Sequence, residues 1–173
     1  QDSRTLYPHW GKPRQAGHGD GQGYTVNIPL AKGAGWPEMK WALEEVVFPV
    51  IREYDPDIVF RTGGCDMHKA DPLSDLCMDD RNFSDLGRTW RGFAIASGYT
   101  WVEFLESGYN EATQAWCWLR YLCGALGIEL PDKLGWLIYE TSREWQDRSA
   151  ALRQTFAELR KALGWKWKCL EGL

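Results

Sequence analysis

Apolar residues recur along the chain in two spacings, which predict an alternation of strands and helices. Short runs rich in β-branched and aromatic residues predict three strands, over 24–30, 58–62 and 100–105. Apolar residues three and four positions apart predict helices from Trp36 to Tyr54, from 82 or 83 to about Ala96, and from Tyr109 to about Gly127. Strands that alternate with helices indicate an α/β fold with right-handed βαβ units and a parallel sheet.

Local signals refine these elements. Pro37 suits the first turn of its helix, whereas Pro49 predicts a kink. The apolar run 57–60 predicts a strand that is buried on both faces. Gly98 is placed to end the second helix, and residues 1–23, which lack periodicity, predict a long loop.

The last third of the chain predicts helices. Segments over 132–141 and 143–163 follow Pro131, and the second carries an apolar stripe formed by Leu152, Phe156, Leu159 and Leu163. Three predicted strands are few for a parallel sheet with covered faces, so the sheet is expected to be unfinished.

Composition narrows the class of protein. The 173 residues suffice for one domain. The net charge is −4 and the sequence contains no polybasic face, so no nucleic-acid partner is expected. No apolar run is long enough to span a bilayer, so no membrane partner is expected. The five cysteines are irregularly spaced, which predicts reduced thiols in a cytoplasmic protein. The eleven tryptophans favour packing over a sugar- or membrane-surface-binding role.

Two polar sites follow predicted strands. Asp66 and His68 lie in a glycine-led stretch, 63–73, after the second strand, and residues two apart in extended backbone could both reach one metal. The alternative is a carboxylate that caps a neighbouring turn. Tyr109 follows the third strand, and its hydroxyl could donate to a developing oxyanion. The alternative is a tyrosine packed at a helix start.

Four segments together resemble the histone deacetylase superfamily, particularly its bacterial branch of acetylpolyamine and acetoin-utilisation deacetylases. They are Tyr7-Pro8, the stretch 19–30, the stretch 64–73 (GCDMHKADPL) and the stretch 105–110 (LESGYN). The likeness covers residues 1–127, which would form the C-terminal half of a catalytic domain with an arginase/deacetylase-type parallel sheet. Residues 128–173 would be a helical C-terminal extension.

The resemblance implies zinc-dependent hydrolysis of an N-acetyl amide on a lysine, a polyamine or a similar amine. Asp66 matches the zinc-ligating aspartate, and Tyr109 matches the tyrosine that stabilises the oxyanion. His68 and Asp71 are expected to be structural or to support a metal ligand. The related arginases have a metal-binding acid at the position of His68, so no dinuclear manganese site is expected. Residues expected to line or shape the substrate tunnel are Leu6, Tyr7, Leu73 and Gly108. The resemblance also allows a structural monovalent cation.

The chain departs from the family pattern in three ways. Ser107 stands where the family usually has glycine, and Arg61-Thr62 replace smaller or apolar residues. The family's further Asp-x-His zinc pair and its His-His base dyad lie upstream of the segment that matches Gln1. Since a catalytic zinc takes three protein ligands, the chain by itself is expected to be inactive.

Two hypotheses follow. The parent protein is a zinc-dependent deacetylase that acts on an acetylated amine or acetyl-lysine, with this chain as a fragment of it. Alternatively, the chain is a truncated, non-catalytic relic that serves as a protein-interaction module. A homo-oligomer through the tryptophan-rich C-terminal helices fits either hypothesis.

Overall fold

The computed structural model describes residues 4–130 and 143–173, which form two compact units. One unit comprises the described residues up to Asp55 together with Gln146–Leu173, and the other runs from Pro56 to Trp145. The predicted boundary near residue 127 concerns the extent of a family domain, so it stays a prediction. The helix predicted over 132–141 lies outside the described residues.

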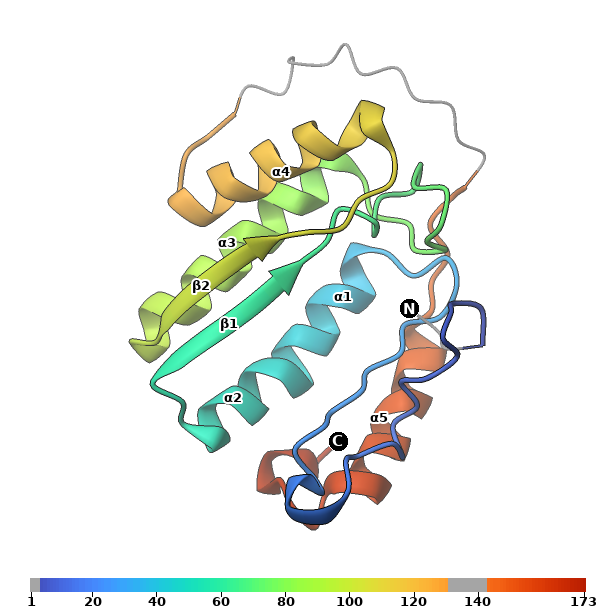
Figure 1. The fold of residues 1–173 in the computed structure, drawn as a ribbon, viewed down its shortest axis with the longest axis vertical. Coiled ribbons are helices and arrows are strands. Elements are labelled where there is room, and N and C mark those ends of the chain that lie inside the picture. The colour runs from blue at the N-terminus through green and yellow to red at the C-terminus, as the bar shows by residue number, and fades with distance from the viewer. Residues whose placement is uncertain (1–3, 131–142) are drawn as a thin grey trace. The chain divides into compact units, whose positions relative to one another are not determined.

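The unit from Pro56 to Trp145 is built on a βαβα sequence. Strands β1 (Ile58–Gly63) and β2 (Thr100–Leu105) pair in parallel and are connected by helix α3 (Asp80–Ser97). Helix α4 (Glu111–Leu126) follows, and α3 and α4 pack against each other along one side of the sheet (Figure 1). The predicted α/β class and parallel sheet are therefore confirmed.

Caps explain where α3 and α4 begin and end. The Asp79 carboxylate accepts hydrogen bonds from the backbone N–H groups of Arg81 and Asn82, so α3 begins two to three residues before the predicted start. Gly98 and Gly127 end the two helices at φ of 73° and 74°, a left-handed conformation that favours glycine. These glycines lie where the sequence placed the ends.

The prediction that the 57–60 strand is buried on both faces is wrong. Ile58 and Phe60 are 46% and 65% exposed, and the Phe60 ring stacks on the exposed Phe104 ring of β2. Helices α3 and α4 cover the other face, where Arg61 lies over the rings of Trp90 and Tyr121. An apolar run alone does not reveal whether a layer of helices covers both faces.

The other unit is helical. Helix α1 (Trp36–Ala42) has Pro37 in its first turn, as predicted, and continues through a π-helical turn (Leu43–Val47) into α2 (Phe48–Tyr54). The wide turn directly precedes Pro49, whose missing N–H interrupts the regular hydrogen-bond ladder. The irregularity that Pro49 predicts in this helix is therefore a π-helical turn just before the proline. Buried side chains of α5 (Ser149–Leu163) include the whole predicted stripe: Leu152, Phe156, Leu159 and Leu163.

Helix α5 begins six residues later than predicted. The residues just before it make tertiary hydrogen bonds instead of helical ones. Gln146 N–H donates to the Gly33 carbonyl at 3.0 Å, and Arg148 N–H donates to Glu38 Oε1 at 2.9 Å. Glu38 is buried and also accepts from the Gly35 N–H, so this carboxylate joins the start of α1 to the start of α5.

The strand predicted over 24–30 is wrong. The segment has no regular secondary structure and pairs with no strand in the part of the chain that the structure describes. Side chains of the C-terminal helical region bond to its backbone and to the residue before it: Thr155 Oγ1 donates to the Pro29 carbonyl at 3.3 Å, and Trp167 Nε1 donates to the Gly23 carbonyl at 2.8 Å. β-propensity describes a residue's fit to a sheet and cannot supply the partner strand.

Candidate functional site

Two loops leave the carboxyl ends of β1 and β2 side by side. Beyond the last paired residues of the strands, Glu106 N–H donates to the Gly63 carbonyl at 3.0 Å and Cys65 N–H donates to the Ser107 carbonyl at 2.7 Å. These two backbone hydrogen bonds join the loop that contains Asp66 to the loop that contains Tyr109. In open parallel sheets this edge is where ligands bind.

Asp71 connects the two loops through its carboxylate. It is 2% exposed. Its Oδ1 accepts from the N–H groups of Leu73 (2.9 Å) and Ser74 (3.1 Å), while Oδ2 accepts from the Tyr109 N–H (2.8 Å). A buried carboxylate with three backbone donors is well compensated, so Asp71 fixes the backbone of Tyr109.

The Asp66 carboxylate is half-buried in the same place. Burial raises the pKa of Asp66, a hydrogen bond with Ser107 opposes this rise, and the nearby Asp71 charge raises the pKa further. A Cβ on Gly64 would meet both Ser107 Oγ and Asp66 Oδ1, so the glycine leaves room for these two side chains. Asp66 is thus a half-buried acid whose ionised form is disfavoured mainly by burial and also by the Asp71 charge.

The Tyr109 side chain is open to solvent, with 55% of its surface exposed. Gly108 before it has φ of +145°, and a Cβ on this glycine would lie 2.9 Å from Cys65 Cβ. Both the backbone conformation and the space therefore require glycine at this turn. The Tyr109 side chain is therefore largely exposed rather than packed into the helix start.

The predicted tunnel residues are divided between the two units. Leu73 donates its backbone N–H to the Asp71 carboxylate, and its side chain is 58% exposed. Leu6 and Tyr7 are also exposed, and they belong to the unit that contains α1 and α5. Their common role in a tunnel stays a prediction.

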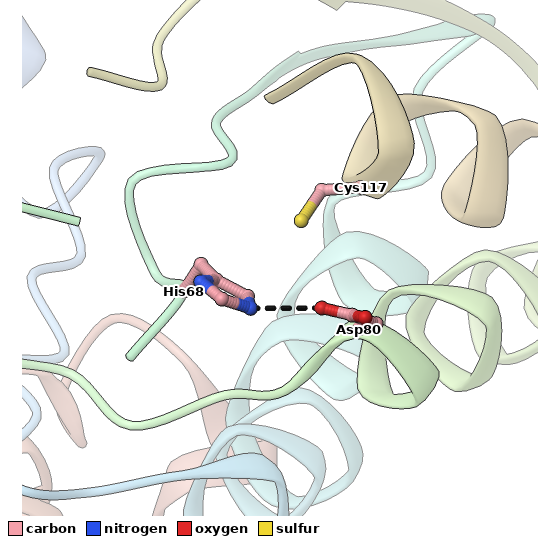
Figure 2. Close-up of side chains that lie close together, drawn as sticks. All are labelled: His68, Asp80 and Cys117. Carbon is pink, nitrogen blue, oxygen red and sulfur yellow. Dashed lines mark hydrogen bonds and ion pairs between the residues drawn. The ribbon is translucent and has the colours of Figure 1, made fainter. Parts of the chain in front are cut away.

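The buried His68 and Cys117 and the partly buried Asp80 lie close together, with His68 contributed by the loop after β1 (Figure 2). Potential ligand atoms of the three side chains lie within 4.8 Å of one another. Nε2 of the fully buried His68 is 2.9 Å from Asp80 Oδ1, and Nδ1 lies 3.1 Å from the N–H of Ala70, which donates to it. Both ring nitrogens are therefore engaged.

This arrangement fixes the histidine tautomer. Nδ1 accepts a hydrogen bond, so the neutral ring carries its proton on Nε2, which donates to Asp80. A metal on Nε2 would move that proton to Nδ1, against the N–H of Ala70, whereas metal-bound histidines donate from the second nitrogen to an acceptor. In addition, a hydrogen bond with Cys65 and burial raise the pKa of the Cys117 thiol, which disfavours the thiolate. We therefore interpret His68 and Asp80 as a structural hydrogen-bonded pair and not as part of a metal site.

We expect the His68–Asp80 pair to stabilise the fold. Burial raises the pKa of Asp80, but the hydrogen bond from His68, with other contacts, brings it below its usual value. Asp80→Ala leaves the buried imidazole N–H without its acceptor, so the free energy of unfolding should fall by about 1–3 kcal/mol. Denaturant titration measures this loss.

The matched control is Asp85→Ala in the same helix. Asp85 pairs with Arg88 at 2.8 Å, but both side chains are partly exposed, and such pairs contribute about 0–1 kcal/mol. Equal losses in the two variants would contradict the structural role of the buried pair.

Sequence reasoning missed the contacts of Asp80, Cys117 and Ser107. Asp80 follows the helix-capping Asp79, so a capping signal was present, but its pairing with His68 depends on the loop that separates them. Ser107 was noted only as a departure from glycine, and nothing in the sequence indicates that its hydroxyl reaches Asp66.

Comparison with known proteins identifies the family of the chain. The histone deacetylase domain matches residues 1–125. A probable deacetylase from Archaeoglobus fulgidus is 30% identical over 173 residues, covering 96% of this chain and 48% of that protein. Histone deacetylase 10 of rice, a chloroplastic protein, is 40% identical over 105 residues, covering 60% and 24%. The chain thus spans about half the length, or less, of these curated relatives.

Solved structures agree on the fold. The HDA15 HD domain superposes with a TM-score of 0.76 at 22% identity, covering 99% of this chain and 43% of that one. The histone deacetylase Clr3 gives a TM-score of 0.72 at 25% identity, covering 98% and 27%. The expected bacterial branch within the superfamily stays a prediction. The matched domain, the curated relatives and the shared fold establish that the chain belongs to the histone deacetylase family.

Proposed function

We propose that the protein containing this chain hydrolyses an N-acetyl amide on lysine, a polyamine or a similar amine with the help of zinc. In this proposal Asp66 is one zinc ligand and Tyr109 stabilises the oxyanion. The observation that carries the proposal is the fastening of the Asp66 and Tyr109 loops at the carboxyl edge of the sheet, through Asp71 and the Cys65–Ser107 backbone bond, in a member of the deacetylase family.

The residues at this edge fit part of a zinc site. Asp66 is a half-buried carboxylate whose pKa is raised by burial and by the Asp71 charge, and a bound cation would favour its ionised form. The nearby His68 has both nitrogens engaged, so it does not complete the site. A catalytic zinc takes three protein ligands. We propose that the family's Asp-x-His pair, in a longer protein, supplies the other two, and that its His-His dyad supplies the general base.

The side chains of this chain would act on the amide carbonyl. Zinc, when bound, supplies a Lewis acid that polarises this carbonyl. The Tyr109 hydroxyl donates a hydrogen bond to the carbonyl oxygen as negative charge develops there. Asp71 holds the Tyr109 backbone, and Gly108 permits the turn, so the hydroxyl needs little reorganisation during the reaction.

A second candidate is the non-catalytic interaction module. The observation in its favour is the exposed apolar sheet face, where Phe60 and Phe104 are 65% and 46% exposed with ring centroids 6.2 Å apart. A partner protein that covered these rings would bury a sizeable apolar area.

Metal removal distinguishes the two candidates. In the full-length protein, we expect stoichiometric zinc and hydrolysis of an acetyl-lysine peptide, with activity lost after chelation by dipicolinate and restored by added zinc. Residues 1–173 alone should be inactive, because they supply too few ligands. A full-length protein that neither binds zinc nor hydrolyses acetyl-lysine or acetylpolyamine would refute the enzyme proposal and favour the interaction module.

A further inference from the structure

Ser107 places a hydroxyl group against the candidate zinc ligand. Its Oγ and the Asp66 carboxylate converge on the small space above Gly64, where a Cβ would clash with both. The two side chains share a hydrogen bond, in which the hydroxyl donates to the carboxylate. Ser107 follows β2, whereas Asp66 follows β1, so this contact joins the two loops through their side chains.

The backbone on both sides of this contact is held in place. The Ser107 carbonyl accepts from the Cys65 N–H at 2.7 Å, and Glu106 N–H donates to the Gly63 carbonyl at 3.0 Å. Since Cys65 directly precedes Asp66, the hydroxyl and the carboxylate are carried by backbone segments that are already bonded to each other. Little side-chain freedom has to be lost for the hydroxyl to reach its acceptor.

The hydroxyl has a clear chemical consequence for a carboxylate ligand. A carboxylate has about four lone-pair sites, so one bond from Ser107 leaves capacity for a cation while restricting rotation of the group. Residues that orient a metal ligand in this way typically change metal affinity about 10–100-fold when they are removed. Glycine, which the family usually has at this position, offers no such donor.

We infer that Ser107 is a positioning residue for Asp66 and strengthens metal binding at this edge of the sheet. The inference rests on the proposed zinc-dependent function and adds to it a contact that this chain makes with its own serine. The role requires the side-chain hydroxyl, because the backbone bond to Cys65 would persist in any variant.

The test compares zinc dissociation constants of the full-length protein and its variants, measured by competition with a fluorescent chelator. Ser107→Ala removes only the hydroxyl, and we expect zinc binding to weaken about 10–100-fold. Ser107→Gly should weaken it similarly, and it serves as the second variant should the alanine protein fail to fold. Ser107→Thr keeps the hydroxyl and should bind zinc nearly as tightly as the unmodified protein.

Ser97→Ala is the matched control. Ser97 Oγ is a buried hydroxyl with no hydrogen-bond partner among the described residues, so its loss should leave zinc affinity unchanged. Unchanged affinity in both Ser107→Ala and Ser107→Gly, with the unmodified protein binding zinc, would overturn the positioning role alone. An unmodified protein that binds no zinc would instead overturn the proposed function on which the inference rests.

Discussion

Tyr109→Phe in the full-length protein should lower kcat for deacetylation by about 10²–10³-fold while zinc stays bound. This is the effect of removing one donor from an oxyanion-stabilising site. The phenylalanine ring should occupy the place of the phenol, because the backbone N–H of residue 109 still donates to Asp71 Oδ2. The loss should therefore fall on kcat, since the hydrogen bond is strongest when charge develops on the oxygen.

Tyr54→Phe provides the matched control for this substitution. Tyr54 is 58% exposed, close to the 55% of Tyr109, but it lies at the end of α2 and contacts the rings of Tyr24 and Trp167. Its loss of a hydroxyl should leave turnover unchanged. Unchanged turnover in Tyr109→Phe would rule out the assigned role, and loss of zinc together with turnover would show that the substitution had damaged the metal site.

Most elements of the fold follow from local signals. β2 coincides with the predicted range 100–105 because it contains β-branched and aromatic residues and lies between Gly98 and a polar turn. The ends of α3 and α4 were predictable because glycine in a left-handed conformation is a local requirement. Burial was less predictable, since the exposure of Phe60 depends on which helices cover the sheet.

The failures share one physical cause. Residues 24–30 have the composition of a strand, but a strand needs a partner, and here the Trp167 and Thr155 side chains bond to neighbouring backbone carbonyls instead. The residues before α5 are likewise drawn into bonds with Gly33 and Glu38. In both cases distant groups compete successfully with local preference.

The candidate site shows the same division. Positions at the ends of predicted strands indicated Asp66 and Tyr109, and the family resemblance added Asp71. The bond from Tyr109 N–H to Asp71 spans 38 positions, and neither residue type indicates it. The tautomer of His68 depends equally on a distant partner, Asp80, and on the adjacent Ala70 N–H. The sequence thus indicates candidate site residues, whereas their hydrogen-bond partners require the fold.

Asp66→Asn should abolish stoichiometric zinc binding and hydrolysis in the full-length protein. The amide keeps the shape of the side chain but lacks the negative charge that a carboxylate ligand supplies. The metal-free fold should not be weakened, because burial and the Asp71 charge disfavour an ionised Asp66, as the raised pKa shows. The zinc content should therefore fall, whereas the free energy of unfolding of the metal-free protein should not.

Asp71→Asn provides the opposite pattern and serves as the control. Its carboxylate accepts three backbone hydrogen bonds, and an amide nitrogen in place of one oxygen would face an N–H donor. This variant should lose about 1–3 kcal/mol of stability. If Asp66→Asn instead destabilised the metal-free protein as much as Asp71→Asn and still bound zinc, Asp66 would be a structural carboxylate. A metal ligand stabilises the protein only when the metal is bound, so its loss should not destabilise the metal-free protein. In that case another residue would have to be the zinc ligand.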